Sequence, residues 1–214
     1  AGEFKPTHGR IHLDGIDVTK WPEHRRAAFI GRVFQNPFQG SAAHMTIAEN
    51  MSLAMLRTQN LGLRLGVNRV RRKKLADLLE PIGLGLENRL NDKVALLSGG
   101  QRQAMTLLMG SLSQPKLLLL DEHTAALDPA TAVRILQITQ SVVQEQRLAT
   151  LMITHNMQQA LTHGTRTLML HKGEIVLDIG QKERDGLTVQ GLIDKFSEVK
   201  QEALMDDELL LSNE

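Results

Sequence analysis

The 214-residue sequence contains no cysteine and no tyrosine, and aromatic residues make up only 3% of it. The lack of cysteine excludes a disulfide scaffold, a thiolate metal site and a thiol nucleophile. The scarcity of aromatic rings weakens any interpretation as a platform for stacked bases or sugars. No apolar run approaches the roughly 18 residues that indicate a membrane-spanning helix. What remains is ordinary globular composition, with 42% hydrophobic and 23% charged residues.

The charges nearly cancel, with 25 lysines and arginines against 24 acidic residues. Such a balance gives no general case for a nucleic-acid partner. Charge is nevertheless uneven along the chain. Residues 64–74 hold six basic side chains and no acidic one, which we interpret as a solvated helix face, with a phosphate or lipid surface as the alternative. Residues 198–214 carry six acids against one lysine, a net charge of −5, and we expect a weakly docked tail.

Local patterns in the first half of the chain predict a hairpin and a capped helix. Residues 10–18 alternate apolar and polar around Asp14-Gly15, a strong hairpin signal. A second short apolar run over residues 28–35 ends in Gln35. Thr46 and Glu49 have the spacing of a capping box at the start of a helix with a methionine-rich face.

From residue 97 onward, helix and strand patterns alternate. A helix is predicted over 99–113, and the four leucines of 117–120 predict a strand covered on both faces. Asp128-Pro129 predicts the start of another helix, and residues 148–154 predict a further buried strand. This alternation indicates an α/β fold with a parallel-sheet core, to which a hairpin over 167–179 adds a small antiparallel portion.

Residues 37–97 break the alternation and read as a mainly helical inserted subdomain. We therefore divide the chain into four parts: the remainder of an N-terminal β portion at 1–36, the helical subdomain at 37–97, the C-terminal part of the α/β core at 98–196 and the acidic tail at 197–214.

Two predicted strands end in polar residues suited to chemistry. In an open parallel sheet, ligands bind outside the carboxyl ends of the strands. Asp121-Glu122 follows the leucine strand, and such a pair suits an aspartate that holds hydrated Mg²⁺ beside a glutamate that polarises water. A plain strand-to-turn boundary is the alternative. The next strand ends in Thr154-His155, where the alternative is an ordinary structural histidine.

Ser98-Gly99-Gly100-Gln101 precedes a predicted helix. Serine can cap the helix, and the two glycines allow a backbone to approach an anion closely. The helix N-terminus offers unpaired N–H groups and the positive end of the dipole. This pattern favours phosphate binding, although a simple glycine-rich cap has the same residues.

The order of these motifs is more specific than any one of them. LSGGQ at 97–101 is followed by LLLLDE at 117–122, by Asp128 and, after another helix and strand, by His155, with Gln35 upstream. This set resembles the ATP-binding cassette (ABC) ATPases, the nucleotide-binding subunits of ABC transporters, over the chain to about residue 180. LLLLDEHTAALDP resembles in particular a group of bacterial import-type subunits.

The resemblance implies ATP and Mg²⁺ as cofactors and a role for each matching residue. Glu122 matches the residue that polarises the attacking water, Asp121 the Walker B acid that holds Mg²⁺, and His155 the switch histidine that contacts the γ-phosphate. Gln35 matches the Q-loop glutamine, which reaches Mg²⁺ and water. The signature motif, which contacts ATP held by the opposite subunit, is matched by Leu97, Ser98, Gly99, Gly100 and Gln101, and the acid at the dimer seam by Asp128.

The sequence also departs from the family pattern. The phosphate loop G-x-x-x-x-G-K-[ST] is missing, since no Gly-Lys dipeptide occurs among the 214 residues. We interpret the chain as a fragment that lacks the first strands and this loop, and expect it to be inactive alone; a naturally degenerate subunit is the alternative. The opening residues also suggest a start inside a larger protein, unless the N-terminus is processed or tagged. His123 stands where the family usually has proline.

The resemblance further implies partners and a location. These are a second ATPase subunit in a head-to-tail dimer, a transmembrane permease that docks on residues 37–97, and a solute-binding protein in the wider system, with no nucleic acid. The protein would be cytoplasmic and peripheral on the inner face of the cell membrane. Two other functions stay open: a soluble ABC-type ATPase of translation or DNA repair, and an interaction module that hydrolyses nothing.

Overall fold

The computed structural model describes residues 1–58 and 66–198. The chain divides into two compact units, Ala1–Ile153 and Thr154–Glu214. The domain boundaries expected at residues 36 and 97 stay predictions, and the acidic tail from residue 199 lies outside the described residues.

The first unit begins with a hairpin and continues into a small parallel sheet. Strands β1 (His12–Leu13) and β2 (Ile16–Asp17) pair antiparallel, and Asp14 and Gly15 between them both have positive φ, at 52° and 76°. Positive φ at both turn residues is typical of a tight hairpin, so the predicted hairpin is confirmed. The short helix α1 (Glu23–Arg26) then leads to β3 (Ile30–Val33).

Strand β3 is one edge of a three-stranded parallel sheet of order β3-β4-β5. The other strands are β4 (Leu117–Asp121) and β5 (Thr150–Ile153), with Ile30 opposite Leu117 and Asp121 opposite Ile153. The predicted parallel α/β core is confirmed. The prediction that β5 is buried is wrong, because Leu151 and Ile153 are 50% and 54% exposed. Among the described strands β5 pairs only with β4, so it lies at a sheet edge.

The described residues within 37–97 are mainly helical, as predicted. They contain α2 (Ile47–Leu56), α3 (Arg69–Leu79) and three short 3₁₀ turns, η1 (Glu80–Ile82), η2 (Leu86–Asn88) and η3 (Val94–Leu96). The capping box at Thr46 is present: its hydroxyl accepts from Glu49 N at 3.2 Å, and the Glu49 carboxylate accepts from Thr46 N at 2.7 Å.

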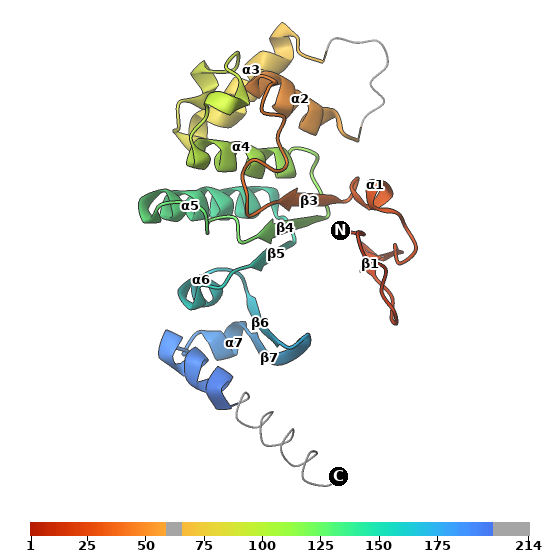
Figure 1. Cartoon of the computed structure of the whole chain (residues 1–214), viewed down its shortest axis with the longest axis vertical. Coiled ribbons are helices and arrows are strands. Elements are labelled where there is room, and N and C mark those ends of the chain that lie inside the picture. The colour runs from red at the N-terminus through yellow and green to blue at the C-terminus, as the bar shows by residue number, and fades with distance from the viewer. Residues whose placement is uncertain (59–65, 199–214) are drawn as a thin grey trace. The chain divides into compact units, whose positions relative to one another are not determined.

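Helix α4 (Gly99–Ser111) connects this helical segment to the sheet. It lies between α2 and α3 on one side and the layer of β3 and α5 (Pro129–Gln146) on the other (Figure 1). One core cluster joins the four helices through Met51, Leu75, Met105 and Ile135. A second cluster packs Leu107 of α4 against Val33, Leu118 and Leu120 of the sheet.

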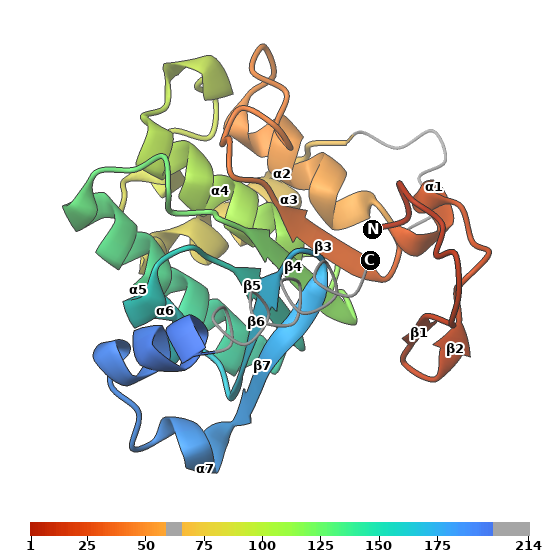
Figure 2. The same cartoon turned by 60° about the horizontal axis from the view of Figure 1, so that its bottom comes forward.

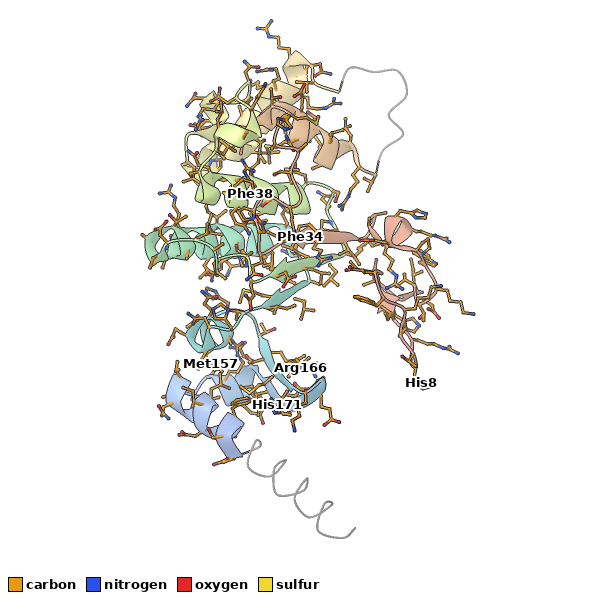
Figure 3. The ribbon with its side chains drawn as sticks, viewed as in Figure 1. His8, Phe34, Phe38, Met157, Arg166 and His171 are labelled. Atoms are coloured by element: carbon orange, nitrogen blue, oxygen red, sulfur yellow. The ribbon has the colours of Figure 1, made fainter. Side chains whose placement is uncertain are left out.

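The second unit is built on one hairpin. After α6 (Met157–Thr162), β6 (Arg166–His171) and β7 (Glu174–Gly180) pair antiparallel and lead into α7 (Gln181–Arg184), as Figure 2 shows. Arg166, labelled in Figure 3, forms an ion pair with Asp178 across the hairpin. Residues 189–198 form a further helix. The predicted hairpin over 167–179 is confirmed.

Candidate functional site

Polar side chains of the first unit meet at the carboxyl end of its parallel sheet. Asp121 is the last residue of β4, Glu122 follows it, and Gln35 comes two residues after the end of β3. The Gln35 amide Nε2 donates a hydrogen bond to Glu122 Oε2 at 2.9 Å, although the two residues are 87 positions apart. The structure therefore brings together three residues that the sequence singled out separately.

The backbone of Glu122 is held in an uncommon conformation. Its φ is +42°, in the left-handed region that residues with a Cβ seldom adopt. Two hydrogen bonds hold it there: Glu122 N donates to Ile153 O at 3.0 Å, and Ala125 N donates to Glu122 O at 2.9 Å. The tight turn places the Glu122 side chain beside the end of the sheet instead of continuing the strand.

Arg32, on β3, belongs to the same site, and sequence reasoning did not identify it. Its guanidinium lies 3.6 Å from the Asp121 carboxylate, and both side chains are partly exposed. It also lies 4.5 Å from the centre of the Phe34 ring. A cation on the strand that ends two residues before Gln35 was the available signal, but its meaning depended on knowing that β3 and β4 are neighbours.

The side chains at this edge suit magnesium as a ligand set. Hard oxygen atoms bind Mg²⁺, which usually takes only one or two protein carboxylates together with phosphate and water. Asp121 supplies a carboxylate, and Gln35 has its amide oxygen available for a metal while its nitrogen binds Glu122. No cluster of three or more histidine, cysteine, aspartate or glutamate side chains that could hold a metal is found in the described parts of the chain.

The LSGGQ segment forms a capped helix start. Ser98 Oγ accepts from Gln101 N at 3.2 Å, and Gln101 Oε1 accepts from Ser98 N at 3.2 Å. Leu97 is buried in the core, whereas Ser98 and Gly99 are exposed at the N-terminus of the 13-residue helix α4. Exposed backbone N–H groups at the positive end of a helix dipole suit an anion.

The first turns of α4 and α5 lie against each other. A Cβ on Gly100 would come within 2.3 Å of Thr131 Cγ2, and one on Gly99 would lie 3.6 Å from Leu127 Cδ2. Asp128 caps α5 by accepting from Thr131 N at 3.0 Å. Hydrogen bonds from the Thr131 side chain and then its backbone lower the pKa of Asp128, which is exposed. The structure therefore gives Asp128 a structural role beside the expected one.

His155 lies in the second unit, in the exposed segment between β5 and α6. Asn156 beside it caps α6 by accepting from Gln159 N at 3.0 Å. The role expected for His155 stays a prediction.

An aromatic contact near the signature helix was also missed. Phe38, labelled in Figure 3, is 65% exposed and lies three residues after Gln35. Its ring centre is 4.1 Å from the guanidinium carbon of Arg102, which is buried on α4 and donates to Val94 O at 2.6 Å. Burial lowers the pKa of Arg102. The contact ties the loop after Gln35 to the helix that begins with LSGGQ.

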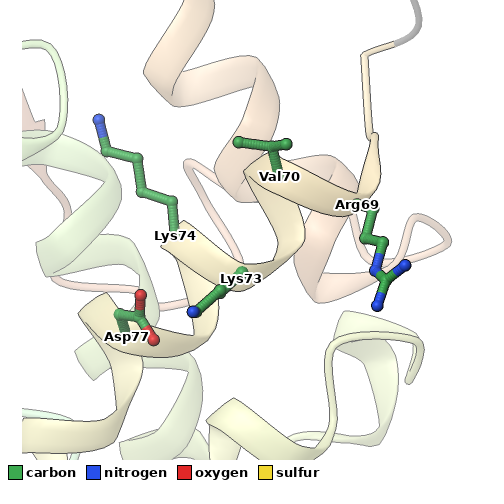
Figure 4. Close-up of a pocket in the computed structure, with 5 residues that line it drawn as sticks. All are labelled: Arg69, Val70, Lys73, Lys74 and Asp77. Atoms are coloured by element: carbon green, nitrogen blue, oxygen red, sulfur yellow. The ribbon is translucent and has the colours of Figure 1, made fainter.

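Five of the six basic residues that were predicted to form a solvated face lie on α3, and the sixth, Arg64, lies outside the described residues. A hollow of about 420 Å³ on this helix is lined by Arg69, Val70, Lys73, Lys74 and Asp77 (Figure 4). None of these residues belongs to the group around Glu122. Leu75 and Leu79 on the other side of the helix are fully buried, so the charges are on the face that packing leaves free.

Comparison with known proteins identifies the family of this chain. The family model described as ABC transporter matches residues 1–125. A tyrosine transport ATP-binding protein of Clostridioides difficile is 46% identical over 92% of this chain and 78% of that protein. The thiamine import ATP-binding protein ThiQ of Escherichia coli strain K12 is 32% identical over 82% of this chain and 70% of that protein.

Solved structures agree. A dimeric ATP-binding cassette in a post-hydrolysis state with ADP and Pi has a TM-score of 0.68 and 27% identity, over 83% of this chain and 75% of that chain. CbiO1 from Clostridium perfringens, part of the transporter complex cbiONQ, shares the fold, with a TM-score of 0.71 and 23% identity over 91% and 74%. In the described residues no helix is long and apolar enough to cross a membrane. The predicted family and fold are confirmed: the chain belongs to the ABC transporter family, as a nucleotide-binding ATPase subunit.

Proposed function

We propose that the chain is the ATPase subunit of a bacterial import system, in which the group around Glu122 performs hydrolysis. The observation that carries this proposal is the 2.9 Å hydrogen bond from Gln35 to Glu122 beside Asp121, at the sheet edge where ligands of parallel α/β proteins bind. Two relatives named for tyrosine transport and thiamine import favour transport over translation or DNA repair.

Glu122 and Gln35 would orient the attacking water. The Glu122 carboxylate accepts a hydrogen bond from the water and draws its proton toward Oε1 or Oε2. The Gln35 amide, which already binds Oε2, limits rotation of that carboxylate. Phosphoryl transfer depends mainly on positioning and on electrostatic stabilisation, so a fixed carboxylate is the principal contribution of this pair.

Asp121, with the amide oxygen of Gln35, would hold magnesium. Bound there, the metal would supply positive charge to the phosphates of ATP. Before the metal binds, Arg32 partly neutralises Asp121 at 3.6 Å.

Leu97, Ser98, Gly99, Gly100 and Gln101 would contact ATP held by a second subunit. The capped and exposed start of α4 suits a phosphate, and its partner would pair head to tail so that each copy completes the site of the other. Asp128 would lie at that seam, and His155 would contact the γ-phosphate. The dimeric neighbour with ADP and Pi supports pairing.

A permease would dock on the helical segment 37–97, and a solute-binding protein would deliver the transported molecule. CbiO1, a fold neighbour, is part of a transporter complex. The subunit would then be cytoplasmic and peripheral on the inner face of the membrane.

The substitution Glu122→Gln tests the catalytic role in a form of the subunit that carries a phosphate loop. We expect turnover to fall on the order of 100-fold or more, while ATP-driven dimerisation persists, because the amide cannot take the proton. Glu145→Gln, an exposed acid on α5, is the matched control and should leave turnover unchanged. Unchanged turnover in Glu122→Gln removes Glu122 from the catalytic role.

The 214 residues alone are proposed to bind MgATP weakly, since they hold no phosphate loop of the G-x-x-x-x-G-K-[ST] type. Titration of the isolated chain with a fluorescent ATP analogue measures this. Tight binding would contradict the proposal, because it would require another cradle for the phosphates.

A further inference from the structure

The uncommon backbone conformation of Glu122 is held by its hydrogen bonds on one side and by a buried neighbour on the other. A positive φ in a residue with a side chain persists only where the surroundings impose it. On one side, Glu122 N is bound to Ile153 O of the sheet. On the other side the chain continues directly into His123, which is 2% exposed and is thus fixed in the interior.

His123 is anchored to the long helix α5 through Thr139. His123 Nε2 lies 3.0 Å from Thr139 Oγ1, and both side chains are buried. The Thr139 hydroxyl donates its one proton to Ile135 O at 2.8 Å, one turn earlier in the helix. Thr139 Oγ1 can therefore only accept from the histidine, so Nε2 carries the proton and donates.

We propose that His123 is a positioning residue that fixes the Glu122 carboxylate by anchoring the strand-to-turn backbone to Thr139. The inference rests on the proposed role of Glu122. The chain from Glu122 through His123 to Thr139 and Ile135 links the site to an 18-residue helix that packs in the core. Satisfied polar contacts in a protein interior make the surrounding structure more rigid, so the hydrogen bond between His123 and Thr139 would hold the turn in one position.

The alternative is that His123 only fills space. A buried histidine without functional consequence would tolerate loss of its partner at a cost in stability, with no change in the chemical step. A positioning residue instead changes kcat while KM for ATP stays the same, because Glu122 acts in the transition state and does not bind the nucleotide in the ground state.

The test uses Thr139→Val and Thr139→Ser in a form of the subunit that carries a phosphate loop. Valine removes the acceptor at similar shape, and we expect kcat to fall about 10-fold with KM unchanged within about 2-fold. Serine keeps the acceptor, so Thr139→Ser should retain the kcat of the parent protein. His123→Gln keeps a donor nitrogen at the place of Nε2 and should retain activity, whereas His123→Leu should behave as Thr139→Val.

Val142→Ala is the control for lost stability. Val142 is buried in the core on the same helix, and its side chain has no group that could hydrogen-bond to His123. This variant should have a lower melting temperature, but its kcat should be unchanged when measured at temperatures where it is still folded. Equal losses of kcat in Val142→Ala and Thr139→Val, or none in Thr139→Val, would overturn the inference.

Nitrogen-15 NMR of the 214-residue chain gives a readout independent of activity. A neutral His123 ring should show its proton on Nε2, and Thr139→Val should alter that signature; a proton on Nδ1 would overturn the inference. Failure of the proposed function is distinguishable: if Glu122→Gln keeps full turnover, the catalytic role fails. If Glu122→Gln is inactive while Thr139→Val is normal, only the inference about His123 fails.

Discussion

Gly100→Ala tests how tightly the first turns of α4 and α5 are packed. A Cβ at this position would come within 2.3 Å of Thr131 Cγ2, whereas carbon atoms in contact prefer about 3.5–4.0 Å. Threonine is branched at Cβ and cannot swing its methyl group away without changing rotamer. Overpacking of this kind costs about 1–3 kcal/mol, and the gain in helix propensity offsets up to about 1 kcal/mol.

The expected net loss is about 1–2 kcal/mol, equivalent to a melting temperature lower by about 2–8 °C. Thr131→Ser removes only the offending methyl group and keeps the hydroxyl that binds Asp128. In the double variant the nearest remaining atom is Thr131 Cβ at 3.7 Å, an ordinary contact. The double variant should therefore recover most of the lost stability. Its loss should be about 1 kcal/mol smaller than the sum of the losses in the two single variants.

Gly99→Ala is the matched control, because its Cβ would meet Leu127 Cδ2 at 3.6 Å without a clash. It should be at least as stable as the parent chain. Urea denaturation at a fixed temperature measures the stability of all five proteins, namely the parent, the three single variants and the double variant. The reasoning is refuted if Gly100→Ala is as stable as Gly99→Ala, or if Thr131→Ser fails to rescue it.

Two further predictions concern stability. Phe38→Ala removes the ring that covers Arg102 and should cost about 1 kcal/mol, while Phe38→Tyr should be neutral; equal thermal melts of the alanine and tyrosine variants would contradict this. The pKa of Asp128 is lower in the folded protein than in the unfolded chain, where it is near 3.9. The ionised Asp128 cap therefore stabilises α5 at neutral pH, and this contribution is lost as the pH falls through the folded pKa. Asp128→Asn keeps a capping oxygen but does not titrate, so the difference in melting temperature between parent and variant should shrink below about pH 4; a constant difference would argue against the cap.

Features set by neighbouring residues were predictable from the sequence. The Asp14-Gly15 turn and the Thr46 capping box depend on residues within a few positions of each other, and both are present. The leucine strand β4 was predicted as covered on both faces, whereas Leu118 and Leu120 are buried and Leu117 and Leu119 only partly so. Hydrophobic patterns show that a strand is apolar, but the extent of its cover depends on the elements that pack around it.

The candidate site was predictable only in part. The strand-end pair Asp121-Glu122 pointed to Glu122, the resemblance to ABC ATPases added Gln35, and the structure adds the hydrogen bond that joins them. Arg32 and the Phe38–Arg102 contact were missed, because each depends on residues far apart in the sequence. No local pattern marks such pairs, since their chemistry appears only when β3, β4 and α4 are placed side by side.

The ion pair between Arg32 and Asp121 affects how the binding of a divalent ion at Asp121 would vary with salt concentration. A divalent ion that approaches Asp121 competes with a guanidinium already 3.6 Å from the carboxylate. Both partners are partly open to solvent, so added monovalent salt weakens their attraction as well as that of the incoming ion. If Asp121 holds a divalent ion as proposed, the affinity for that ion would therefore depend less on ionic strength than at a carboxylate that has no basic neighbour.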